Sequence, residues 1–151
     1  MSSSFLESLH KNHDNISEVQ ALNLAYIGDA VFEVLVRTFI INGSRLATNE
    51  LHKAAKNYVN AHAQAEMYKA LSNHINEEEM AIMRRGRNAK SQTKAKNASI
   101  NDYRHATGTE ALFGYLYMKN DIKRLMELFE ICLKTVENAG SGQEPMPAIK
   151  E

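Results

Sequence analysis

Apolar residues are densest over residues 18–41, where the run LNLAYIGDAVFEVLV predicts one long helix. Ser17 stands where an N-cap would stand, and Asn42 and Gly43 follow the last apolar residues, as is common where helices end. Apolar positions occur on almost every side of this helix. We therefore expect it to be buried at the centre of the fold.

Two helical regions are predicted in the middle of the chain. Residues 46–71 are rich in alanine and other helix formers, with a break expected near Asn57. Asn76 precedes three glutamates, which is the pattern of an N-cap followed by an acidic first turn. The helix that begins there should end near Gly86.

Two more helices are predicted in the C-terminal third. Thr107 or Thr109 can cap a helix that runs through Met118, and Asn120 or Asp121 can cap the last one. The last helix has apolar residues at helical spacing, namely Ile122, Leu125, Met126, Phe129, Cys132, Leu133 and Val136.

The fold class follows from what the sequence lacks. Both prolines, Pro145 and Pro147, lie in the last seven residues, and the alternating pattern of a strand is nearly absent, so we expect an all-α fold. The length of 151 residues suits one domain. We expect an N-terminal arm over residues 1–16, one helical domain over 17–138 and a disordered tail over 139–151.

Cysteine usage and the N-terminus indicate a cellular compartment. Cys132 is the single cysteine, so an internal disulfide is excluded, and no cluster has the spacing of a zinc site. The first residues lack the basic and apolar regions of a signal peptide, and no apolar run reaches 18 residues. We expect a cytoplasmic protein without a membrane segment.

The charges are unevenly distributed. Basic and acidic residues number 18 each, but residues 84–105 hold seven lysines and arginines against one acid, a net +6. The basic residues are Arg84, Arg85, Arg87, Lys90, Lys94, Lys96 and Arg104. Such a run is typical of a solvated surface, but arginines around a glycine also suit contacts with phosphates. We take these residues, Arg104 apart, as candidate nucleic-acid-binding residues.

Two carboxylates are candidates for chemistry. Asp29 lies in an apolar run, where it either caps a helix that restarts after Gly28 or binds a metal, with Glu33 one turn later. Glu110 either completes a capping box with Thr107 or supplies the second carboxylate of that metal site. Two carboxylates from different helices would suffice for Mg²⁺, which retains several waters.

Several motifs, taken in order, resemble one family. LAYIGDAVFEVLVR resembles the signature of the ribonuclease III domain, and EALFGYLY resembles its second block. LHKAAKNYVNAHAQAEM, RRGRNAKS and YRHATGTEALFGYLY are similar to blocks of Mini-III, the short branch that lacks a double-stranded-RNA-binding domain. The resemblance covers residues 17–136.

This resemblance implies a Mg²⁺-dependent endoribonuclease that cuts double-stranded RNA as a homodimer and matures the precursor of 23S ribosomal RNA. It assigns catalysis and metal binding to Asp29 and Glu110, and it places Tyr26 at the dimer interface. A ribosomal protein is a possible further partner. Three positions that are acidic in the larger enzymes are changed here, to Leu22, Ala25 and Thr107.

Two other classes of function remain open. A non-catalytic RNA-binding module of the ribonuclease III fold is compatible with the reduced set of acids. A helical adaptor that binds proteins through its apolar helices is compatible with the helix pattern. Metal-dependent cutting of an RNA duplex would favour an enzyme over the non-catalytic module. Absence of RNA binding at low salt would favour the adaptor over both RNA-binding classes.

Overall fold

The computed structural model describes residue 9, residues 15–90 and residues 99–139. The elements in order are η1 (Ile16–Glu18), α2 (Ala21–Gly43), α3 (Thr48–Ala55), α4 (Ala61–Leu71), α5 (Glu77–Asn88), α6 (Ile100–Met118) and α7 (Ile122–Ala139). These described residues contain no strand, which confirms the all-α prediction. None of their helices has the length and hydropathy of a membrane span. The expected arm and tail fall almost wholly outside the described residues, as do Lys94 and Lys96.

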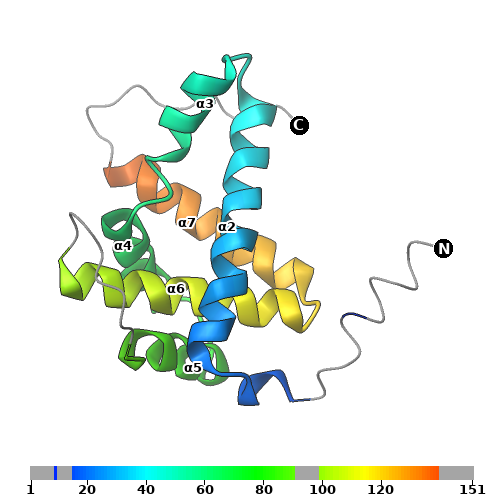
Figure 1. The fold of residues 1–151 in the computed structure, drawn as a ribbon, viewed down its shortest axis with the longest axis vertical. Coiled ribbons are helices and arrows are strands. Elements are labelled where there is room, and N and C mark those ends of the chain that lie inside the picture. Colours follow the sequence, from blue (N-terminus) through cyan, green and yellow to red (C-terminus); the bar gives the residue numbers. More distant parts are fainter. Residues whose placement is uncertain (1–8, 10–14, 91–98, 140–151) are drawn as a thin grey trace.

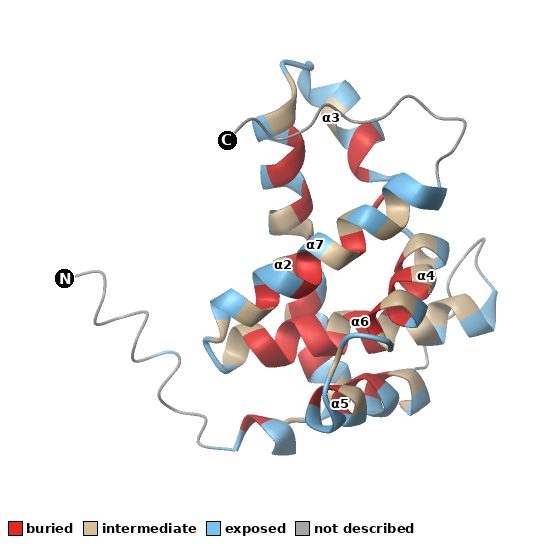
Figure 2. Cartoon of the chain, turned by 180° about the vertical axis from the view of Figure 1, so that it is seen from behind, coloured by how far each residue is buried: buried red, intermediate tan, exposed pale blue. Residues whose placement is uncertain are grey.

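Helix α6 lies at the centre of the fold (Figure 1), where it packs against α2, α4, α5 and α7. Its middle is buried nearly all round, as the red segments in Figure 2 show. Phe32 of α2, Phe113 of α6 and Phe129 of α7 join these three helices in the core. The ring of Phe32 meets the other two edge to face, with centroids 5.3 and 5.9 Å away.

Helix α2 differs from its prediction in two ways. It begins at Ala21 after Gln20, whose side chain makes no capping hydrogen bond, and Ser17 lies in the short helix η1. The expectation of full burial is also wrong, because Tyr26 and Val34 are largely exposed. Helix α2 packs against the core along one side only, and its apolar composition continues onto the outer side.

Helices α3, α4 and α5 agree with the pattern. The break predicted near Asn57 separates α3 from α4, and the N-cap of α4 is Asn60, whose side chain accepts a hydrogen bond of 2.8 Å from the amide of Ala63. Asn76 and Glu79 form a reciprocal capping box at the start of α5. Helix α5 ends at Asn88, two residues beyond the predicted end.

The last two helices give one correction. Helix α6 begins at Ile100 with Ser99 as its N-cap, so neither Thr107 nor Thr109 is a cap. Both threonines lie inside the helix. The hydroxyl of Thr107 donates to the carbonyl of Tyr103, and that of Thr109 lies 2.9 Å from the carbonyl oxygen of Gln64 in α4 and 3.3 Å from that of His105. The predicted cap of α7 is confirmed, since the side chain of Asp121 accepts from the amide of Arg124 at 3.2 Å.

A partly buried ion pair holds α5 to α7. Glu79 is 3% exposed and accepts two hydrogen bonds of 2.9 Å from the guanidinium of Arg124. Burial alone would raise the pKa of Glu79, but the hydrogen bonds from Arg124 and from the Asn76 amide hold it below its usual value. Arg124 also donates to the carbonyl of His74. This network orients α7 relative to the turn before α5.

Candidate active site

The site begins at the crossing of α2 and α6, where two glycines face each other. A Cβ atom added at Gly28 would lie 1.7 Å from the carbonyl oxygen of Glu110, and one added at Gly114 would lie 1.9 Å from the carbonyl oxygen of Leu24. No side chain fits in these gaps, so glycine allows the two backbones to touch. Gly28 therefore does not interrupt α2, and Asp29 does not cap a second helix.

This crossing brings the two predicted carboxylates together. Asp29 follows Gly28 on the exposed side of α2, and Glu110 is the residue of α6 whose carbonyl Gly28 contacts. Burial and the nearby charge of Asp29 raise the pKa of Glu110 to about 8. Burial and the charge of Glu33 raise the pKa of Asp29. The alternative of a capping box is excluded, since Glu110 lies in the third turn of α6.

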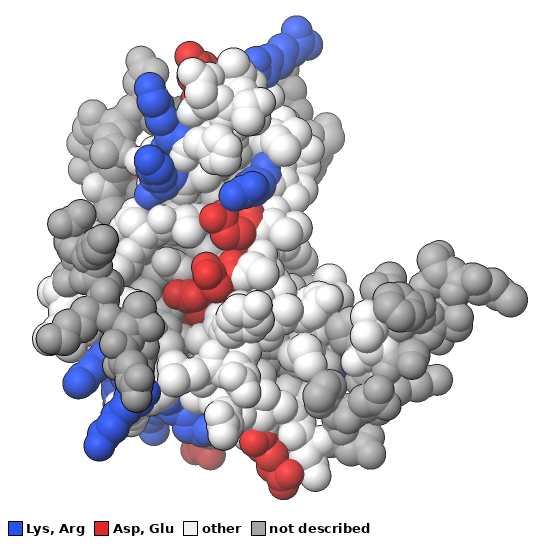
Figure 3. Space-filling model, viewed as in Figure 1, with Lys and Arg blue, Asp and Glu red and all other residues white. Residues whose placement is uncertain are grey.

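Glu33 extends the acidic surface along α2. It lies one turn after Asp29, and its carboxylate accepts a hydrogen bond of 3.3 Å from Nε of Arg37, one turn further on. Residues four apart share a helix face, so the three side chains form one row. Figure 3 shows acidic atoms at the centre of this face of the molecule, with basic atoms above and below them.

The donor set fits a magnesium ion. Burial and neighbouring carboxylate charges disfavour the ionised forms and raise both pKa values, and a bound divalent ion would offset both causes. In the described part of the chain no three acidic, histidine or cysteine side chains are placed to hold a metal together. Two carboxylates with water in the remaining positions match the preference of Mg²⁺ for few protein ligands.

The positions changed from the larger enzymes do not contribute carboxylates. Ala25 is buried, and Leu22 is exposed on the outer side of α2. The hydroxyl of Thr107 donates to the carbonyl of Tyr103 at 2.9 Å, so its hydrogen is used within its own helix. The acidic character of the site therefore comes from Asp29 and Glu110, with Glu33 beside them.

The predicted RNA-binding residues have different surroundings. Arg84 and Lys90 are exposed. Arg87 lies over the ring of Tyr68, with its Cζ atom 5.9 Å from the centroid. Arg85 instead donates to the carbonyls of Ser17 and Val19, so it holds the segment before α2 against α5.

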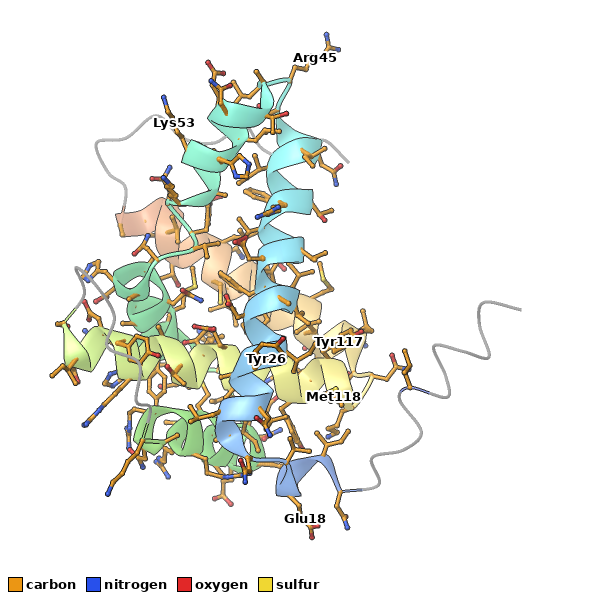
Figure 4. All side chains as sticks on the ribbon, in the orientation of Figure 1. Glu18, Tyr26, Arg45, Lys53, Tyr117 and Met118 are labelled. Atoms are coloured by element: carbon orange, nitrogen blue, oxygen red, sulfur yellow. The ribbon has the colours of Figure 1, made fainter. Side chains whose placement is uncertain are left out.

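A second basic group lies on the other side of the acids, and the sequence pattern did not reveal it. Arg37 follows Glu33 on α2, while Arg45 and Lys53 lie at the far end of α2 and on α3 (Figure 4). The acids therefore lie between basic side chains in two directions along this face (Figure 3). Lys53 on the short α3 and Lys56 just after it were a usable signal, but two alanines separate them and they form no run.

Tyr26 lies on the outer face of α2 and is 83% exposed. Figure 4 shows Tyr117 and Met118, from the end of α6, beside it on the same face. Leu22 and Val34 continue the exposed apolar side of α2. We call this face, formed by Leu22, Tyr26, Val34 and Met118, the α2 apolar face.

Comparisons with known proteins agree with these features. A family model described as the ribonuclease III domain matches residues 22–121. A Mini-ribonuclease 3 from Brevibacillus brevis is 47% identical over 116 residues, which span 77% of this chain and 87% of the relative. Another from Clostridium tetani is 42% identical over 130 residues, which span 85% of this chain and 86% of the relative.

A solved structure is also similar. The crystal structure of a Fusobacterium nucleatum protein superposes with a TM-score of 0.72 at 29% identity, over 80% of this chain and 96% of that one. The helical arrangement is therefore shared with an experimental structure. From the domain match and these relatives, the chain belongs to the ribonuclease III family, and it is an endoribonuclease.

Proposed function

We propose that this endoribonuclease cuts double-stranded RNA in a Mg²⁺-dependent reaction and that it matures the precursor of 23S ribosomal RNA in the cytoplasm. The observation that supports metal-dependent cleavage is the pairing of Asp29 with Glu110 at the glycine crossing, where burial raises the pKa of both. The ribosomal substrate rests on the similarity to Mini-III alone.

Asp29 and Glu110 would hold the metal ion. When bound, Mg²⁺ supplies a Lewis acid for the scissile phosphate and lowers the pKa of a water that can attack it. The two carboxylates fix where that cation lies, because they belong to helices whose backbones are in contact. In-line attack that expels the 3′ oxygen leaves a 5′-phosphate on the product.

Basic side chains on this face would bind the RNA backbone. Duplex RNA has a deep, narrow major groove that side chains cannot read, so its recognition depends on shape and phosphate contacts. Arg84 and Arg87 of α5, Lys90 after it and Lys53 of α3 would contact these phosphates. Basic atoms lie above and below the acids in Figure 3, which supports contacts on both sides of them.

A homodimer would supply the second active site. Cutting both strands of a duplex requires two centres that face it, which a two-fold dimer provides. The α2 apolar face is the surface we assign to that contact, with Tyr26 at its centre. Tyr26→Asp should give a monomer of low activity by light scattering, and a fully active monomer of the parent protein would contradict the assignment.

The test of the proposed function is incubation of the purified protein with a perfect RNA duplex, with Mg²⁺ and with EDTA. We expect cleavage only with Mg²⁺, and none for Asp29→Asn or Glu110→Gln, whose folds should be intact by circular dichroism. Thr107→Ala is the matched control, since it alters a neighbouring side chain that carries no charge, and its effect should be mild. RNA binding without cleavage would favour the non-catalytic module.

A further inference from the structure

The ring of Tyr68 lies where α4, α5 and α6 meet. Tyr68 of α4 is 4% exposed, and its ring packs against the Cα position of Gly108, where a Cβ atom would lie 2.7 Å away. The ring of His105 from α6 meets it edge to face, with centroids 4.7 Å apart. The guanidinium of Arg87 from α5 lies 5.9 Å from the same centroid. Tyr68 thus positions two nitrogen-bearing side chains from different helices.

The orientation of His105 is defined by a hydrogen bond. Its Nδ1 lies 2.8 Å from the carbonyl oxygen of Asn101, which can only accept, so Nδ1 carries a proton. In the neutral ring, Nε2 is then an acceptor and repels a phosphate oxygen. Protonation turns Nε2 into a charged donor, the form that attracts a phosphate.

The charged groups around His105 favour an anion. Arg87 contacts the same Tyr68 ring as His105 does, and Arg104 precedes His105 on its own helix. The acid on this part of α6, Asp102, is paired with His62 of α4 at 3.2 Å. When His105 is protonated, it and Arg87 are two cations that contact one ring. They repel each other unless an anion lies between or beside them. Arginine is also suited to phosphate contacts, because its planar group presents several donors.

We propose that Arg87 and His105, positioned by the ring of Tyr68, form a binding site for a backbone phosphate of duplex RNA, and that protonation of His105 strengthens it. This inference rests on the proposed function, since it needs duplex RNA as the ligand. It adds a contact residue and a dependence on protons separate from that of Glu110, which His105→Gln leaves unchanged.

The test measures binding without catalysis. A fluorescently labelled RNA duplex is titrated with the full chain in EDTA between pH 5.5 and pH 8, with anisotropy as the readout. At pH 5.5 we expect the parent protein to bind the duplex roughly five-fold more tightly than His105→Gln does. A factor of this size is typical of one partly exposed hydrogen bond to a charged group. At pH 8 the two proteins should bind alike. Titration of other groups is common to both and cancels in their ratio.

Salt dependence provides a readout that a structural role would not change. A phosphate interaction that forms on protonation should steepen the slope of log K against log salt by about 0.9, taking the value for B-DNA as a guide. The parent protein should show this change between pH 8 and pH 5.5, and His105→Gln should not. His74→Gln is the matched control, because His74 is exposed near the start of α5, and it should behave as the parent does.

Two variants of Tyr68 separate its ring from its hydroxyl. The hydroxyl is buried without a hydrogen-bond partner among the described residues, so Tyr68→Phe should retain both the fold and the proton-dependent binding. Tyr68→Leu removes the ring face and should lose the dependence, with circular dichroism as the check on folding. Dependence that survives in a folded Tyr68→Leu would remove the ring from the proposal.

Other outcomes overturn the inference in distinct ways. If His62→Gln abolishes the proton dependence and His105→Gln does not, the titrating group is the partner of Asp102 and the site is wrong. If inorganic phosphate shifts the His105 resonances in an NMR titration but RNA affinity is independent of His105, the site binds free phosphate and not the duplex. If the parent protein binds no duplex, the proposed function fails as well.

Discussion

Gly28→Ala tests whether the crossing of α2 and α6 positions the active site. The new methyl group would lie 1.7 Å from the Glu110 carbonyl oxygen and 2.8 Å from the Gly114 amide nitrogen. Carbon and oxygen atoms in contact lie about 3.5 Å apart, so the helices must separate by roughly 1.5 Å. Backbone atoms cannot rotate away as a flexible side chain can. We therefore expect a loss of about 3 kcal/mol, the upper part of the range for overpacked cores.

Helix propensity alone predicts the opposite sign for Gly28→Ala, a gain of about 0.5–1 kcal/mol. The free energy of unfolding is measured by urea unfolding followed by circular dichroism. In a separate thermal melt, we expect the melting temperature to fall by roughly 10 °C for a chain of this size. Thr38→Ala, at an exposed position of the same helix, is the control and should change stability by less than about 0.5 kcal/mol. A Gly28→Ala protein as stable as the parent would refute the reasoning.

The same substitution should also affect the proposed cleavage. Parting the helices moves Asp29 relative to Glu110, and a misplacement of about 1 Å in a catalytic geometry can cost 100-fold in rate. We expect a loss of that order in single-turnover cleavage at a temperature where the variant is still folded. Unchanged cleavage in the folded variant would show that the distance between the two carboxylates is not limiting.

Three further predictions test other parts of the structure. In EDTA the free energy of unfolding should fall by about 3–4 kcal/mol from pH 5 to pH 8, because Glu110 keeps its proton to about pH 8 when folded but loses it near 4.5 when unfolded. Glu110→Gln should melt higher than the parent at pH 8, and a flat pH profile in the parent would contradict this. Arg124→Ala leaves Glu79 buried without its cation and should cost about 3–5 kcal/mol in urea unfolding, whereas a loss below about 1 kcal/mol would mean that water replaces the guanidinium. Arg84→Ala should weaken duplex binding and lower the salt slope of that binding, at an unchanged melting temperature. Arg85→Ala should lower the melting temperature, because Arg85 binds the carbonyls of Ser17 and Val19. The reverse result would mean that Arg85 contacts the RNA and Arg84 holds the fold.

Much of the helical architecture could be read from local pattern. The capping box at Asn76, the break near Asn57 and the cap at Asp121 all depend on residues within one turn of each other. Such signals are present in the sequence because the interactions themselves are local. The start of α6 was misplaced because Thr107 with Glu110 has the spacing of a cap, and the true cap at Ser99 follows a polar segment.

The sequence was enough to select the two candidate carboxylates, but not to show how the helices bring them together. Asp29 was selected because it is a charge in an apolar run, and Glu110 because it lies in the motif that resembles the second block of the ribonuclease III domain. The structure brings both to one crossing. That Gly28 allows this contact, and that Arg85 binds backbone carbonyls, depends on residues far apart in the sequence. Spacing along one helix carries no information about what the next helix places opposite it.

The exposed position of Tyr26 has a consequence for the products of the reaction. Tyr26 lies one turn before Asp29 on the same helix, so in the proposed dimer the contact between copies sets how the two cutting centres, one in each copy, face the duplex. Each centre acts on one strand. When the protein is diluted below the dissociation constant of the dimer, the product should change from duplexes cut in both strands to duplexes nicked in one strand. The ratio of the two products therefore reports the state of assembly.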